Sequence, residues 1–74
     1  MMVDWRDTDK QCDRICEKIE ELEDVDAARD FVESVREKVV SIQETIVSRQ
    51  RVTPKQQAAL NNMEAGVDKW FHDD

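Results

Sequence analysis

The sequence has few of the residues that form turns, strands and catalytic sites. Its 74 residues include one glycine, one proline, one histidine and no tyrosine. So few turn-forming residues argue against a β-sheet protein, and a single glycine excludes a glycine-rich phosphate loop. No run of about 18 apolar residues is present, and residues 1–10 carry Asp and Arg where a signal sequence would be apolar. We therefore expect a soluble, cytoplasmic protein that does not enter the membrane.

The chain is instead rich in charge. It carries 18 acidic and 11 basic residues, for a net charge of −7, and 39% of its residues are apolar. The apolar residues recur at regular spacing, so we expect residues 1–74 to fold as one domain. A domain of this size buries only a small core, which disfavours a large enzyme with a deep pocket.

Apolar residues spaced three and four apart predict three helices. The first spans about residues 8–23 and places Cys12, Ile15, Ile19 and Leu22 on one side. The second spans about 26–50 and the third about 54–71. The connections between them are short, which favours antiparallel neighbours. The sequence therefore predicts an all-α fold, a three-helix antiparallel bundle with a long central helix.

The second helix has a heptad stripe that runs from Val25 to Ile46. Phe31, Val40 and Val47 lie beside this stripe and widen it, as a helix with two packed neighbours requires. The stripe also offers more apolar positions than two short helices cover. We therefore expect this helix to be central and the protein to form a homodimer, with the monomer as the alternative.

Local signals mark the ends of the predicted helices. Asp4 lies near the start of the first helix, where a carboxylate caps free N–H groups. Thr53 and Gln56 flank Pro54 in the pattern of a capping box, which predicts that a helix begins at residue 54. Gly66 falls inside that third helix, and close contact with a neighbouring helix would explain it.

Cys12 and Cys16 form a Cys-x3-Cys pair on one side of the first helix. The pair would supply half of a metal site, with His72 and a carboxylate as further ligands. The alternative is that both cysteines fill the core as small apolar residues. We adopt the second interpretation and expect no metal, no cofactor and no catalytic residues. His72 is then expected to interact with the dipole of the third helix.

Acidity is concentrated in the first third of the chain, since residues 1–24 hold nine acidic and four basic residues. A dense negative surface repels nucleic-acid phosphates and attracts a basic cleft. The alternative is an ordinary solvated helix face interspersed with Lys10, Arg14 and Lys18. The acidic residues predicted to bind a partner are Asp13, Glu17, Glu20, Glu21 and Asp24.

Two further groups are candidates for binding. Arg49, Arg51 and Lys55 surround the start of the third helix, where they would bind a phosphate or an acidic partner, or else interact with the last carbonyls of the second helix. Trp5 and Trp70 lie near the two chain ends and are expected to cover the two ends of the core. An exposed tryptophan would instead anchor a partner.

The segment 51–63 resembles part of small helical proteins encoded by phages and prophages. It shows the pattern Thr-x-x-Gln-x-x-Ala-Leu-x-x-Met after an Arg and a Val, and the preceding helix carries Phe31-Val32-Glu33-Ser34. The likeness covers about half of the chain. It implies a viral origin, with bacterial cytoplasm as the location. Short acidic proteins of that origin often bind and inhibit a host enzyme or defence complex, an inference from analogy.

The function predicted from these observations is non-catalytic. The helical surface would bind a host protein or protein complex and modulate or inhibit it. The alternative is an accessory module of nucleic-acid processing that contacts phosphate through Arg49, Arg51 and Lys55. The net charge of −7 opposes direct binding of nucleic acid.

Overall fold

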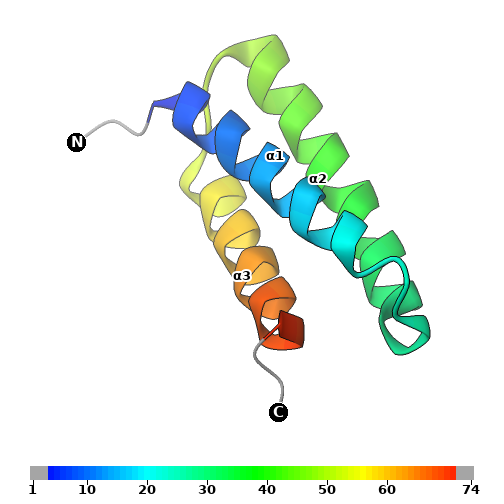
Figure 1. Ribbon diagram of the computed structural model, residues 1–74. Helices are drawn as coiled ribbons and strands as arrows, with labels where there is room; N and C mark the ends of the chain where they lie inside the picture. Colours follow the sequence, from blue (N-terminus) through cyan, green and yellow to red (C-terminus); the bar gives the residue numbers. More distant parts are fainter. Residues whose placement is uncertain (1–3, 72–74) are drawn as a thin grey trace.

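A computed structural model of the protein describes residues 4–71. They form three α-helices, α1 (Trp5–Glu21), α2 (Arg29–Arg49) and α3 (Pro54–Phe71), with a short 3₁₀ turn, η1 (Asp26–Ala28), before α2. Figure 1 shows α1 and α3 running in broadly the same direction and α2 returning between them along the chain. The predicted three-helix bundle is confirmed, and the middle helix is the longest, with 21 residues.

The helix ends follow the local capping chemistry. Helix α1 begins three residues before the predicted position, because the Asp4 carboxylate accepts a hydrogen bond from the Arg6 N–H at 3.0 Å. Helix α3 begins and ends where it was predicted. Its capping box is confirmed, since Thr53 Oγ1 accepts from the Gln56 N–H at 3.1 Å and Gln56 Oε1 accepts from the Thr53 N–H at 3.0 Å.

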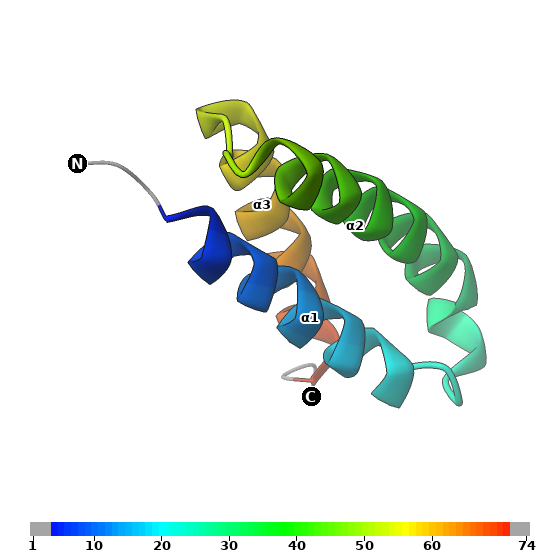
Figure 2. The same ribbon diagram turned by 90° about the horizontal axis from the view of Figure 1, so that it is seen from above.

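The core consists of the predicted apolar stripes of all three helices except for Val25, the first residue of the stripe of the second helix. Val25 precedes η1 and is 38% exposed, because α2 begins at Arg29 and not near residue 26. The sequence predicted that the second helix packs broadly against both neighbours, but α1 is the helix that does so, whereas α2 and α3 touch each other much less. Figure 2 shows the arrangement of the three helices from above. The side chains buried most completely include Ile15 and Ile19 of α1, Val39 and Ile46 of α2, and Leu60 and Val67 of α3.

Two valines of α2 do not join the core. The sequence predicted that Val40 and Val47 widen the apolar stripe of α2, but their exposed fractions are 41% and 45%. The reason is that both valines lie on the side of α2 opposite Ile42, which faces α3, and no helix within residues 4–71 covers that side. Phe31, the third residue of the widened stripe, is half-buried and does pack against the core.

Phe31 also explains the glycine inside α3. A Cβ atom added to Gly66 would lie 3.3 Å from Phe31 Cζ, closer than ordinary van der Waals contact. Beside this contact, the rings of Phe31 and Trp70 lie 6.0 Å apart between centroids, with a 42° tilt. The predicted close approach of a neighbouring helix at Gly66 is therefore confirmed. Trp5 and Trp70 are both half-buried against the core, as predicted.

Candidate functional site

A row of polar side chains joins α1 to α3. We call it the polar seam, and its members are Thr8, Gln11, Arg14 and Lys18 of α1 and Gln57, Asn61, Glu64 and Asp68 of α3. On each helix the members are three or four residues apart, so they lie along one side of it. The seam runs beside the apolar core and was not predicted as an interface.

The first half of the polar seam is a network of neutral groups. Thr8 Oγ1 donates to Gln57 Oε1 at 2.8 Å, and Gln57 Nε2 donates to Gln11 Oε1 at 2.7 Å. Gln11 Nε2 in turn donates to Asn61 Oδ1 at 2.9 Å and to Glu64 Oε1 at 3.2 Å. Thr8 and Gln11 are buried, and these bonds supply the partners that buried polar groups require.

The second half of the polar seam is ionic. Arg14 binds the Glu64 carboxylate with two hydrogen bonds, of 2.7 and 3.1 Å. Lys18 Nζ lies 2.8 Å from Asp68 Oδ1 and 3.4 Å from Glu64 Oε2. Hydrogen bonds from the Arg14 guanidinium are the main reason that the pKa of Glu64 falls to about 2, and Asp68 is the main cause of a raised pKa at Lys18.

This pairing engages two of the three bases on the acidic side of α1 and of the turn after it, and leaves Lys10, three residues before Asp13, exposed among the acids. We call this side the acidic face, and its residues, all exposed, are Asp13, Glu17, Glu20, Glu21 and Asp24. The alternative interpretation of the sequence placed Lys10, Arg14 and Lys18 among these acids as neutralising charges. The structure directs Arg14 and Lys18 to α3 instead. Negative charge is therefore concentrated on the outward side of α1.

Helix α2 also contacts the acidic side of α1. Gln43 Nε2 donates to Asp9 Oδ1 and to Asp13 Oδ1, each at 2.8 Å, and Arg36 forms an ion pair with Glu23. The amide of Gln43 orients Asp13 without neutralising it. Arg36 pairs with Glu23, which does not belong to the acidic face, and it also lies near Glu20, which does.

The two cysteines lie where apolar residues belong. Cys12 is fully buried and Cys16 half-buried, and both are free thiols. Burial is the main reason that the pKa of Cys12 rises to about 11, and burial also raises the pKa of Cys16. Across residues 4–71, no three His, Cys, Asp or Glu residues come close enough together to hold a metal ion. His72, the further ligand considered from sequence, lies outside the described residues.

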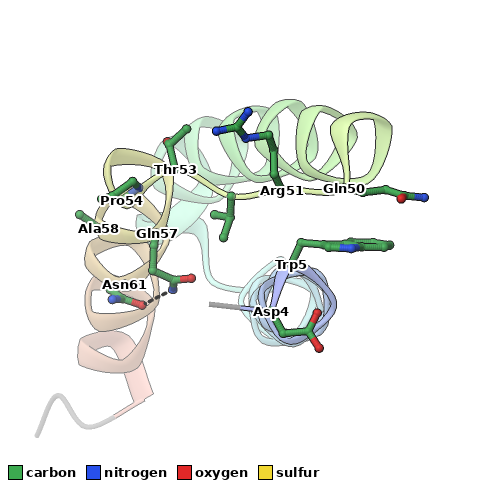
Figure 3. Close-up of a pocket in the computed structure, with 10 residues that line it drawn as sticks. Asp4, Trp5, Gln50, Arg51, Thr53, Pro54, Gln57, Ala58 and Asn61 are labelled. Carbon is green, nitrogen blue, oxygen red and sulfur yellow. Dashed lines mark hydrogen bonds between the residues drawn. The ribbon is translucent and has the colours of Figure 1, made fainter. Parts of the chain in front are cut away.

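A cleft of about 830 Å³ lies beside Trp5 and the turn between α2 and α3 (Figure 3). Of the predicted anion-binding residues, Arg51 lines this cleft, whereas Arg49 and Lys55 are not among the lining residues. Figure 3 shows the Arg51 side chain rising away from Trp5. Gln57 and Asn61, which also line the cleft, are already engaged in the polar seam. Anion binding by the three bases stays a prediction.

The polar seam is the feature that sequence reasoning missed. Its signal was present, because Gln57, Asn61, Glu64 and Asp68 recur at spacings of four, three and four along α3. The same spacing also fits a solvent-exposed helix face, so it did not identify an interface on its own.

No known protein family matches the chain, and comparison with curated proteins and with solved structures yields no match. None of the helices in residues 4–71 has the length and apolar character needed to cross a membrane.

Proposed function

We propose that this is a non-catalytic binding protein that uses the acidic face of α1 to bind a basic surface of another protein. The observation that carries the proposal is the engagement of Arg14 and Lys18 with Glu64 and Asp68. If Arg14 and Lys18 were unpaired, their positive charges would offset much of the negative charge of the acidic face at a distance. Here Arg14 and Lys18, two of the three bases among these acids, are each paired with an acid of α3, while Lys10 stays exposed beside the row.

A concentrated charge of one sign has a specific effect on association. It speeds the encounter with an oppositely charged surface and orients the two proteins, and salt weakens both effects. The partner class that follows is a basic cleft or groove. The resemblance to phage proteins favours a bacterial host protein or defence complex, whose activity would be modulated or inhibited when its basic site is covered.

The ionisable groups support a non-catalytic role. General acid–base catalysis is most efficient when a group has a pKa near neutrality. Arg14 lowers the pKa of Glu64 to about 2 and burial raises the pKa of Cys12 to about 11, and both changes lead away from neutrality. Cys16 also moves upwards, which lowers its thiolate fraction and its nucleophilicity as a thiol.

The test is affinity capture from bacterial lysate with two matched variants. In one, Glu17→Lys, Glu20→Lys and Glu21→Lys reverse the acidic face. In the other, the control variant, the same charge change is made at exposed acids outside the acidic face, with Asp7→Lys, Asp26→Lys and Asp30→Lys. Circular dichroism confirms that both variants keep their helices.

We expect the wild type and the control variant to capture the same host protein, and the acidic-face variant to lose it. Capture by the wild type is expected to weaken at high salt. Equal capture by all three proteins would contradict the proposal, because the acidic face would then serve only solvation.

A further inference from the structure

Helix α2 carries apolar surface on two opposite sides outside the core. On one side Val40 and Val47, seven residues apart, form an exposed ridge. On the other side a groove of about 290 Å³ lies between α2 and α3, lined mostly by apolar atoms, with Ile42, Ala59 and Met63 as its apolar residues. Val40 and Ile42 are two residues apart, which places them on opposite sides of the helix.

The groove follows from how α2 and α3 meet. Phe31 and Trp70 bring large rings together near one end of the two helices, and the turn after Arg49 joins the other end. Between these points the groove is lined by the small side chains Ser41 and Ala59. Small side chains leave the space between the two helices unfilled, so that Ile42 and Met63 are only partly covered.

The ridge and the groove differ in their charges. Glu44 lies between the two valines of the ridge, Glu33 lies seven residues before Val40, and Gln43 holds Asp13 of α1 beside them. Arg36, four residues before Val40 on the same side of α2, is paired with Glu23. The other charges named beside the ridge are acidic.

Basic residues dominate the surroundings of the groove. Lys38 lines the groove, Arg49 follows Ile42 by seven residues on the same side of α2, and Lys55 precedes Ala59 by four on α3. Glu37 is the acidic residue in its lining. The surface around the groove is thus basic in a protein whose net charge is −7.

We propose that the groove binds the ridge of a second copy of this chain. The two surfaces are both apolar at their centres and opposite in charge at their edges, which is the complementarity that orients an interface. Pairing of ridge with ridge would bring Glu33 and Glu44 of both copies together. Pairing of groove with groove would bring bases together and would fill neither groove.

The arrangement of the two surfaces also fixes the symmetry. Because ridge and groove lie on opposite sides of α2, two copies that share one ridge–groove contact each keep one surface free. The contact is therefore head-to-tail, and further copies join the assembly through the free surfaces as the concentration rises. Its small size favours a weak interaction that dissociates on dilution.

The test is sedimentation equilibrium over a concentration series, with one variant for each surface. The ridge variant carries Val40→Lys and Val47→Lys, both at exposed positions. The groove variant carries Lys38→Glu and Ala59→Glu, and Lys38→Glu alone serves as a second groove variant that leaves the packing of Ala59 intact. Circular dichroism checks the fold of each.

We expect the average mass of the wild type to rise past that of a dimer, and each variant alone to remain a monomer. An equimolar mixture of ridge and groove variants restores one intact contact and is expected to stop at the dimer. A monomeric wild type at every concentration would overturn the proposal, as would a monomeric mixture. A wild type that stops at the dimer would show a two-fold contact instead.

A variant of the acidic face separates this proposal from the proposed function. The protein with Glu17→Lys, Glu20→Lys and Glu21→Lys keeps both ridge and groove, so it is expected to associate like the wild type. If it stays monomeric, the acidic face takes part in self-association and the contact is not the one inferred here.

Discussion

Arg14 and Glu64 are joined by two parallel hydrogen bonds between α1 and α3, from Nε to Oε2 at 2.7 Å and from Nη2 to Oε1 at 3.1 Å. They lower the pKa of Glu64 from 4.5 to about 2. A carboxylate whose pKa is lower in the folded protein stabilises the fold above its unfolded pKa. That stability is lost as the pH falls from 4.5 towards 2.

We therefore expect Glu64→Gln to reduce the free energy of unfolding at pH 7 by about 1 to 2 kcal/mol. The pKa shift corresponds to about 3 kcal/mol, and solvent screening at Arg14, whose side chain is 54% exposed, reduces it. Urea denaturation of the wild type and the variant measures the free energy of unfolding at pH 7 and at pH 3. The variant should lose less stability on acidification than the wild type, whereas exposed Glu33→Gln should behave like the wild type. Equal pH slopes for wild type and Glu64→Gln would contradict the prediction.

Gln11 is the buried centre of the neutral half of the polar seam, with 8% of its surface exposed. Replacing it with Met keeps the length of the side chain and removes its hydrogen bonds to Gln57, Asn61 and Glu64. We expect a loss of about 1 to 3 kcal/mol in unfolding free energy, because the partners lose their bonds. Thermal and urea unfolding measure it.

Asn62→Met, at an exposed position of the same helix as Asn61, is the control and should lie within about 0.5 kcal/mol of the wild type. If Gln11→Met is as stable as the wild type, the hydrogen bonds of the polar seam contribute nothing net to stability.

Gly66 and Phe31 should respond to substitution as a pair. Gly66→Ala favours the helix by about 1 kcal/mol, but its new Cβ would lie 3.3 Å from the Phe31 ring. In the wild type, we expect this contact to cancel most or all of the gain in unfolding free energy. In a Phe31→Leu background the ring is absent, and the gain should appear. A double-mutant cycle of unfolding free energies measures the coupling. Equal effects of Gly66→Ala in both backgrounds would show that the ring yields without cost.

The two thiols should differ in reactivity with an alkylating reagent at pH 8. Cys12 is fully buried with its pKa raised to about 11, whereas Cys16 is half-buried with its pKa also raised. We expect slow modification of Cys16 and modification of Cys12 only on unfolding, followed by mass spectrometry. The denatured protein, in which both thiols react quickly, is the control. Rapid labelling of both thiols in the folded protein would contradict their placement against the core.

The parts of the fold that depend on neighbouring residues in sequence were predictable. Thr53 and Gln56 fix the start of α3 through bonds within four residues, and the apolar stripes identify Ile15 and Val39 as core. The exposure of Val40 was not predictable in this way, because it depends on where α1 lies relative to α2.

The candidate site was only partly predictable for the same kind of reason. The acidic residues of α1 are visible in the sequence, but whether Arg14 neutralises them depends on the position of Glu64, fifty residues later. The charge pattern alone left both interpretations open. The direction of the basic side chains decides between a mixed and an acidic surface.

The polar seam also constrains how the sequence can change over time. Gln11 and Gln57 each donate and accept within the same network, so neither can be replaced without leaving the other mismatched. A shift of α3 along α1 by one turn would likewise pair the wrong groups. Positions of α1 and α3 in the polar seam should therefore change together among relatives of this protein, while the apolar core positions exchange one aliphatic residue for another independently.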